Sequence, residues 1–167
     1  SVLIHMSTDY VFDGEASAAY REGAQTNPQG VYGKTKLLGE LAIQRSGCEY
    51  LVIRTAWVFS EYGNNFMKTM LRLGAERDEL SIVGDQIGCP TYAQDLAKGI
   101  VAVLAKVESK QCEYGLYHYC GDSACSWYEF AEVIFKQAKD RGLNVPGLIN
   151  CISTADYPTP AKRPRYS

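Results

Sequence analysis

The sequence predicts an α/β fold built around a parallel β-sheet. Short runs of almost wholly apolar residues are typical of strands buried on both faces, as parallel strands are. Between these runs lie longer segments whose apolar residues recur at helical spacing. The chain has 167 residues, of which 46% are hydrophobic, and this is enough for one globular core. Three core strands make a thin sheet, so we expect neighbouring strands from outside this sequence.

The first predicted strand covers residues 2–6, and a polar loop begins at Ser7. Asn27 is the predicted N-cap of the helix that follows, because its side chain can accept a free backbone N–H and Pro28 suits the first helical position. Gly47 is the predicted stop of this helix. Three glycines in this region are poor helix formers and are expected where a backbone or a ligand approaches closely: Gly30, Gly33 and Gly39.

The remaining elements follow in the order expected of an α/β protein, with insertions between the core strands. They are a strand at residues 50–53, a helix from Asn64 or Asn65 to about residue 76, a strand at 80–83, a loop at 85–92, a helix at 93–106 and a strand at 116–119. Ser126 and Glu129 match a capping box, which predicts a last helix ending near residue 141 before Gly142.

Composition excludes several classes of function. The net charge is −2, and no basic stripe predicts a nucleic-acid surface. No run of 18 apolar residues predicts a membrane span, and no signal peptide is visible. Six cysteines include no C-x-x-C pair and only two histidines are present, which argues against zinc. We therefore expect reduced, partly buried thiols, with Cys89 inert, and a cytoplasmic protein.

Tyr32 and Lys36 are the first candidates for chemistry. Four residues apart on a helix, they share a face. A phenol is a weak acid, but a neighbouring ammonium stabilises the phenolate, so the pair can hand a proton to a carbonyl oxygen as hydride arrives at carbon. Thr8 follows the first predicted strand, at the sheet edge where ligands gather in open α/β folds. Its hydroxyl would complete a group that polarises a carbonyl.

The spacing of Tyr32 and Lys36 is weak evidence by itself. Y-x-x-x-K occurs by chance in many helices, where it is a surface tyrosine beside a solvated lysine. A series of further motifs in order along the chain is far more specific. These motifs are residues 7–14, residues 32–36, residues 54–59, residues 63–66, residues 85–91 and the pair Arg163 and Pro164.

This series resembles the extended short-chain dehydrogenase/reductase family, and within it the reductases of dTDP-linked 4-keto sugars. The resemblance spans essentially the whole chain. It implies the carboxy-terminal part of a Rossmann-type, doubly wound parallel sheet plus a smaller α/β substrate-binding domain. The implied division assigns residues 1–62 and 93–120 to the Rossmann-type domain and residues 63–92 and 121–167 to the sugar-nucleotide domain.

The reaction implied by the resemblance is reduction of the 4-keto group of dTDP-4-dehydro-L-rhamnose to dTDP-L-rhamnose by NADPH or NADH. Tyr32 would donate the proton, and Lys36 would tune it and bind the nicotinamide ribose. Thr8 would hydrogen-bond the reacting oxygen. The neighbours of Thr8 would lie beside the sugar and the cofactor: Asp9 and Tyr10 at the sugar, and Ser7 at the cofactor.

Other substrate contacts implied by the resemblance each have a structural alternative. Trp57 would contact the sugar, but a tryptophan after a strand is as often part of a core. A helix start at Asn64, Asn65 and Phe66 could hold a diphosphate on its free N–H groups, but ordinary capping explains it equally well.

The last candidates lie in a loop and in the carboxy-terminal tail. Gln86, Pro90 and Thr91 resemble the wall of a nucleotide-sugar pocket, although turn chemistry alone accounts for such residues. Arg163 could face a diphosphate, but a proline-rich basic tail is more often solvated. The partner predicted by all of these residues is a dTDP-sugar.

A dinucleotide site needs a glycine-rich turn after the first strand of the fold, and this sequence has none. We therefore expect a fragment whose phosphate-binding turn would lie upstream, and which binds dinucleotide poorly and has little activity alone. A sheet cut at residues 2–6 exposes an edge, which predicts a homodimer or pairing with another chain.

Two other functions remain open at this point. A non-catalytic relative, like the regulatory subunit of methionine adenosyltransferase, could keep the fold to bind a partner. A sugar-nucleotide 4,6-dehydratase or epimerase could share the Tyr32 and Lys36 motif. A dehydratase would be expected to carry an acidic residue at the position of Tyr10, which argues against elimination chemistry.

Overall fold

A computed structural model describes residues 1–159 and 163–167. Its centre is a three-stranded parallel sheet in the order β1-β2-β7. The strands are β1 (Val2–Thr8), β2 (Glu49–Thr55) and β7 (Gly115–His118). In the register of β1 and β2, Ser7 lies opposite Arg54 and Thr8 opposite Thr55. The prediction of an α/β fold with a thin parallel sheet is confirmed.

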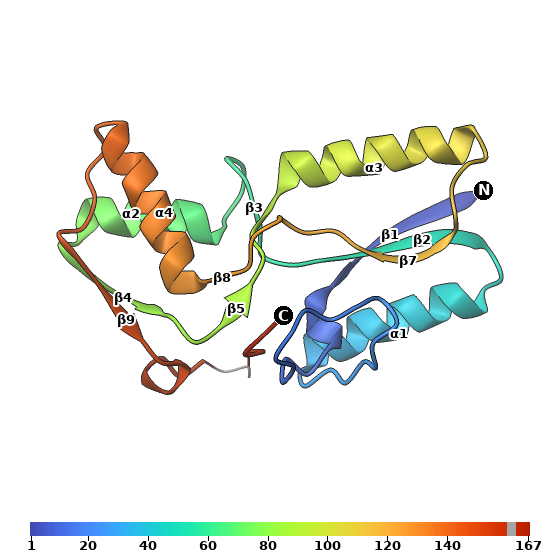
Figure 1. The fold of residues 1–167 in the computed structure, drawn as a ribbon, viewed down its shortest axis with the longest axis horizontal. Coiled ribbons are helices and arrows are strands. Elements are labelled where there is room, and N and C mark those ends of the chain that lie inside the picture. The colour runs from blue at the N-terminus through green and yellow to red at the C-terminus, as the bar shows by residue number, and fades with distance from the viewer. Residues whose placement is uncertain (160–162) are drawn as a thin grey trace.

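Two helices lie on opposite sides of this sheet, α1 (Val31–Arg45) and α3 (Ala93–Glu108) (Figure 1). Helix α1 connects β1 to β2 as a βαβ crossover, and α3 leads into β7. We call β1, α1, β2, α3 and β7 the sheet unit. Because all its strands are parallel, their carboxyl ends meet at one edge, and the loops that leave this edge carry the predicted motif residues.

The N-cap of helix α1 lies three residues later in the chain than the sequence predicts. Gly30 is its N-cap, whereas Asn27 belongs to the preceding loop, where its amide donates to Asp13 and its backbone N–H donates to the carbonyl of Val11. The N-cap prediction at Asn27 was wrong because these tertiary contacts hold the side chain elsewhere. Gly47 follows the helix at φ +72°, as predicted for its stop.

Two further helices pack together over a second, two-stranded parallel sheet. The elements are α2 (Phe66–Glu76), α4 (Trp127–Asp140), β4 (Glu79–Val83) and β9 (Leu148–Ile152), which we call the small unit. Its core is apolar and consists of Met70, Leu80, Ile82, Phe130, Ala131, Ile134 and Phe135. Asn65 caps α2 and Ser126 opens α4 with a capping box, both as predicted.

Strand β9 was not predicted from the sequence. Its residues, Leu-Ile-Asn-Cys-Ile, carry a polar residue at the centre and show no clean alternation. The segment becomes a strand because β4 supplies its hydrogen-bonding partner. The predicted loop at 85–92 likewise contains two short strands, β5 (Ile87–Gly88) and β6 (Thr91–Tyr92), which pair with β8 (Cys125–Ser126) and β3 (Val58–Phe59).

The end of the chain runs between the two units (Figure 1). The chain also contains two short 3₁₀ helices, η1 (Asp9–Val11) and η2 (Thr154–Asp156). The backbone N–H of Tyr166 donates to the carbonyl of Gly14, and that of Ser167 donates to the carbonyl of Ile87. Among the helices described here, none is long and apolar enough to cross a membrane.

Candidate active site

The turn that leaves β1 is held by its own polar side chains. The hydroxyl of Thr8 accepts from the backbone N–H of Tyr10 at 3.3 Å and donates to Asp9 Oδ1 at 2.9 Å. Thr8 thereby caps η1. Thr8 and Asp9 are both buried and Tyr10 is half-buried. A hydroxyl and a carboxyl are therefore fixed at the carboxyl end of β1.

Tyr32 and Lys36 stand on the first turns of α1, against this turn. The ring of Tyr32 meets the ring of Tyr10 edge to face, with 5.7 Å between centroids, and 57% of Tyr32 is exposed. The ammonium of Lys36 donates to the carbonyl of Met6 at 2.5 Å. An added Cβ on Gly33 would lie 2.1 Å from the carbonyl oxygen of Tyr10, so only glycine allows α1 to approach this closely.

Of the other two glycines predicted at close approaches, Gly39 is in ordinary contact with His5, and Gly30 faces open space. No backbone of the described residues approaches Gly30, which serves as the N-cap of α1, and the approach of a ligand there stays a prediction.

Lys36 fits the role of a ribose ligand. An ammonium has three N–H donors, and the bond to Met6 uses one. Two donors remain for the hydroxyl groups of a nicotinamide ribose. The phosphate groups of such a cofactor need a glycine-rich turn that this sequence does not contain.

Asp9 is a buried carboxyl with one free oxygen. Its Oδ2 has no hydrogen-bond partner within the described part of the chain. Burial raises the pKa of the Asp9 carboxyl, and hydrogen bonds from Ser167 and Thr8 oppose this effect. Such a carboxyl holds its proton to a higher pH than usual, and it can donate as well as accept a hydrogen bond.

A buried ion pair lies one helical turn beyond Lys36. Glu40 is 0% exposed and accepts two bonds from the guanidinium of Arg54, at 2.9 Å and 2.6 Å. Ser7 donates its hydroxyl proton to the same carboxylate. The side chain of Ser7, which was predicted to contact the cofactor, therefore points into the protein interior. The pair was missed in the sequence, where the single available signal is that Glu40 continues the four-residue spacing of Tyr32 and Lys36.

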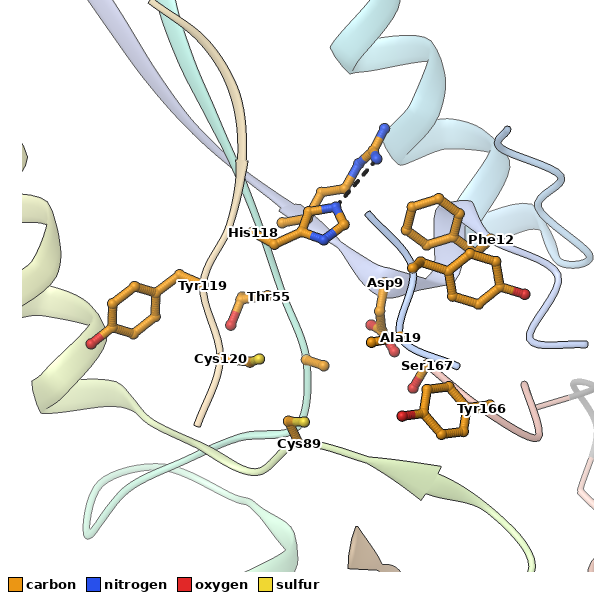
Figure 2. A pocket seen from close by; sticks show the side chains of 13 residues that line it. Asp9, Phe12, Ala19, Thr55, Cys89, His118, Tyr119, Cys120, Tyr166 and Ser167 are labelled. Atoms are coloured by element: carbon orange, nitrogen blue, oxygen red, sulfur yellow. Dashed lines mark hydrogen bonds between the residues drawn. The ribbon is translucent and has the colours of Figure 1, made fainter. Parts of the chain in front are cut away.

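A cavity of about 100 Å³ opens at the carboxyl ends of the three sheet strands (Figure 2). Its lining consists of Asp9, Phe12, Ala19, Tyr20, Arg54, Thr55, Ala56, Cys89, His118, Tyr119, Cys120, Tyr166 and Ser167. Of the predicted site residues, only Asp9 lines it. Tyr32 and Lys36 do not line it, so the cavity lies beside the Tyr32 centre and shares Asp9 with it.

His118 and Cys89 are two titratable groups of this cavity. Burial lowers the pKa of His118, and Arg54, whose Nη1 lies 3.5 Å from Nε2, lowers it further (Figure 2). Burial raises the pKa of Cys89 to about 11, and Cys120 adds to the shift. The Cys89 thiol therefore stays protonated at neutral pH, which fits an unreactive cysteine.

Trp57 lies in a second group, made of aromatic rings. Its backbone adopts φ +48°, and its indole stacks on Trp127 with 3.4 Å between centroids. Phe66 packs on Trp127 at 4.5 Å. The side chain of Gln86 accepts from Trp127 Nε1 at 3.2 Å and donates to Thr154 at 3.0 Å. Trp127 was missed because its sequence signal is that of a helix start.

The remaining predicted contacts are divided between structural roles and open surface. Asn65 caps α2 by accepting from Lys68, whereas Asn64 is exposed. Thr91 is buried and donates to the carbonyl of Ala56 at 2.7 Å. These bonds leave Asn65 and Thr91 with roles that the fold itself requires.

Pro90 and Arg163 have different neighbours in the structure. The carbonyl of Pro90 lies so close to Gly121 that an added Cβ there would be 2.3 Å away. Arg163 is exposed, lies near Tyr10 and lowers its pKa, although burial and Asp9 raise the pKa of that phenol overall. Arg163 and Tyr10 line one shallow depression together with Gly30. The predicted residues thus form two groups, one around Tyr32 and one around Trp57.

Comparison with known families and proteins gives one consistent match. The model of the family described as the RmlD substrate binding domain matches residues 1–167. A dTDP-4-dehydrorhamnose reductase of Aggregatibacter actinomycetemcomitans is 48% identical over all of this chain and 58% of its own length. The enzyme of that name from Escherichia coli K12 is 42% identical over 99% of this chain and 56% of its own length.

Solved structures agree with these relatives. A dTDP-4-dehydrorhamnose reductase of Clostridium acetobutylicum is 43% identical with a TM-score of 0.88, covering 98% of this chain and 55% of that protein. One from Bacillus anthracis in complex with NADP is 40% identical with a TM-score of 0.86, covering 98% and 54%. A dTDP-glucose 4,6-dehydratase of the same organism, 17% identical, shares the fold alone. The chain spans a little over half the length of the curated relatives it matches.

Proposed function

The chain belongs to the family of RmlD substrate-binding domains, and on that premise we propose that it functions as part of a reductase. The proposed enzyme converts dTDP-4-dehydro-L-rhamnose to dTDP-L-rhamnose. One observation carries the proposal. The exit of β1, with Thr8 and Asp9, is pressed against the first turn of α1, which carries Tyr32 and Lys36. This brings a phenol, an ammonium and a hydroxyl to the carboxyl edge of a parallel sheet.

The proposed chemistry is proton donation to a ketone. The cofactor, NADPH or NADH, supplies the hydride that adds to C4 of the sugar. Tyr32 donates its hydroxyl proton to O4, so the carbonyl becomes an alcohol and the tyrosine becomes a phenolate. Lys36 stabilises that phenolate by its charge and retains two donors for the ribose. Thr8 favours the developing negative charge on O4 by turning its one hydroxyl proton from Asp9 Oδ1 to O4, while its oxygen still accepts from the N–H of Tyr10.

We propose that the nucleotide sugar extends from this centre toward the small unit. Asp9 and Tyr10 lie beside the sugar, and Arg163, exposed near Tyr10, faces the diphosphate. Trp57, supported by Trp127, offers an aromatic surface near the sugar. The other proposed contacts are Asn64, Asn65, Phe66, Gln86, Pro90 and Thr91, several of which act by shaping the wall, because their polar groups are already bonded.

The division of the chain at residues 62, 92 and 120 is part of the same proposal. It is supported by the separate apolar core of the small unit.

A cytoplasmic setting is supported by six free cysteines, which suit a reducing compartment. We also propose that the open edge of β1 pairs with a second copy of this chain; a single monomer mass in light scattering at high concentration would contradict that.

The function is tested in a hybrid reductase, in which this chain replaces the matching segment of the Clostridium acetobutylicum relative. We expect consumption of NADPH or NADH with dTDP-4-dehydro-L-rhamnose and formation of dTDP-L-rhamnose, followed by chromatography. A hybrid that binds NADPH but leaves the keto sugar unchanged would favour a non-catalytic binding subunit. Loss of water from dTDP-glucose would favour a dehydratase.

Cofactor binding by the chain alone is a separate measurement. Because the glycine-rich turn is not in this sequence, we expect weak binding of NADPH in calorimetry. Tight binding would contradict this expectation and leave the proposed reduction unaffected.

A further inference from the structure

Helix α1 carries a third polar residue at the spacing of its first two. Tyr32, Lys36 and Glu40 follow one another at intervals of four and therefore lie along one stripe of the helix. Glu40 is 0% exposed. Glutamate is rarely buried so completely unless it is paired. Its burial on the stripe of the proton-donating pair indicates a role connected with that pair.

Residues of β1 and β2 both bind the carboxylate of Glu40. Arg54 donates from Nε to Oε1 at 2.9 Å and from Nη2 to Oε2 at 2.6 Å, a two-pronged geometry that fixes direction as well as distance. Ser7 donates its hydroxyl to Oε1. Ser7 and Arg54 are opposite one another in the register of β1 and β2. Glu40 thus ties α1 to the penultimate residues of two adjacent strands, Ser7 and Arg54.

The arginine is itself held from other sides. Its guanidinium carbon lies 5.0 Å from the centroid of the Phe12 ring, and its Nη1 is 3.4 Å from the carbonyl of Glu22. Arg54 is only 5% exposed. A buried ion pair contributes little net stability compared with apolar packing of the same volume. The value of the pair therefore lies in the geometry that it imposes.

Three contacts fix α1 along its length. Gly33 rests on the carbonyl of Tyr10, Lys36 binds the carbonyl of Met6, and Glu40 is bound at the strand ends. A slip of one residue would move the helix by about 1.5 Å and turn it by about 100°. The phenol of Tyr32 is more than half exposed, so its position follows from the position of the helix.

We propose that Glu40 and Arg54 are positioning residues of the reduction, which hold α1 in the register that brings the Tyr32 hydroxyl to the ketone oxygen. This inference rests on the proposed function. A general acid acts only within about 2.6–3.2 Å of the atom that it protonates. A displacement of about 1 Å far from the chemistry can lower turnover on the order of 10²-fold.

The test uses Glu40→Gln and Arg54→Lys in the hybrid reductase, with Glu76→Gln as the matched control. Glu76 forms a pair with Arg72 on the exposed face of α2. We expect kcat per folded molecule to fall at least about tenfold in both variants, with KM for the sugar changed less than about threefold. Arg54→Lys keeps the positive charge but cannot form the two parallel bonds to Glu40, so the charge alone should not restore kcat. Full kcat with only a lower Tm would overturn the proposal.

Hydrogen exchange supplies a readout that is independent of turnover. In Glu40→Gln, we expect faster exchange at the amides of the first turns of α1, with α4 unchanged as the internal reference. Unchanged exchange in α1 would also overturn the proposal. Ser7→Ala keeps the ion pair and removes one link to β1, so it serves if Glu40→Gln does not fold, with the same expectation at a smaller size. If the unmodified hybrid lacks turnover but Glu40→Gln still exchanges faster than it in α1, Glu40 does fix the helix and the reductase function is rejected.

Discussion

The sheet unit and the small unit both have buried apolar residues, but they differ in how many polar groups they bury. Where the chemistry is proposed, the sheet unit buries polar groups, among them Ser7, Thr8, Asp9, Glu40 and Arg54. The small unit buries apolar side chains of α2, α4 and β4 in one cluster. Polar contacts depend steeply on direction and distance, whereas apolar burial is proportional to area and tolerates small shifts.

This difference suits two tasks. The proposed proton donor must be placed within a fraction of an ångström, and we infer that directional bonds at the ends of β1 and β2 supply that placement. The proposed platform for a nucleotide sugar needs a stable body and a broad aromatic surface, and the rings of Phe66, Phe130 and Trp127 pack together in the small unit. Mutations should therefore separate activity from stability in the sheet unit and join them in the small unit.

The largest effect should come from Tyr32→Phe in the hybrid reductase. Removing the hydroxyl removes the proposed acid, and general acid catalysis is worth roughly 10²- to 10⁴-fold in turnover. We expect kcat to fall by that factor while substrate binding persists. Because 57% of Tyr32 is exposed, the free energy of unfolding should change by less than about 0.5 kcal/mol.

Tyr157→Phe is the matched control, since Tyr157 is 58% exposed and lies outside the proposed centre. It should leave both kcat and Tm unchanged. Turnover by Tyr32→Phe at the level of the control would remove Tyr32 from its assigned role. A large loss of stability in Tyr32→Phe would instead contradict the expectation that activity and stability can be changed separately in the sheet unit.

The second effect tests the small unit through Phe135→Ala. Phe135 is buried in α4, and its ring lies so close to Gly74 of α2 that an added Cβ there would be 2.6 Å away. The cavity left behind should lower the free energy of unfolding by about 3–5 kcal/mol. Val133→Ala, on the exposed face of the same helix, should cost less than about 0.5 kcal/mol in chemical denaturation. Equal costs for the two variants would show that this core does not carry the unit.

Local signals allowed the sequence to predict much of this fold. Asn65 and Ser126 were identified as helix starts because the cap and the groups it binds are only a few residues apart. Strand β9 was missed because its formation depends on pairing with β4, far away in the sequence. Asn27 was misassigned because Asp13 and Val11 hold it in the loop.

The candidate site divides in the same way. Thr8, Tyr32 and Lys36 could be found because each belongs to a local motif. The contact of Glu40 with Arg54 joins a helix to the strand that follows it, and the stack of Trp57 on Trp127 joins segments from different parts of the fold. The sequence indicates neither partner, because the topology brings these residues together; the spacing of Glu40 from Lys36 is a signal for the helix face but not for Arg54.

The third and smallest effect links stability to chemistry at Asp9. Burial raises the pKa of this carboxyl above its ordinary value of 3.8. The folded state therefore binds the proton more tightly than the unfolded state does. The stabilisation from the neutral form is complete below about pH 4 and is lost as the pH rises through the raised pKa. Above that range the wild type carries a buried charge with one oxygen unpartnered among the described residues.

Asp9→Asn removes this titration and can keep the bond from Thr8. Because the variant carries no buried charge, it should be more stable than the wild type at neutral pH. The difference should shrink as the pH falls toward 4, as denaturant titrations at several pH values would measure. Asp95→Asn, at an exposed position of α3, should show no such trend. A stability difference for Asp9→Asn that stays constant with pH would mean that burial does not raise the pKa of the carboxyl. A gain in stability without loss of sugar binding would place Asp9 outside the proposed sugar site.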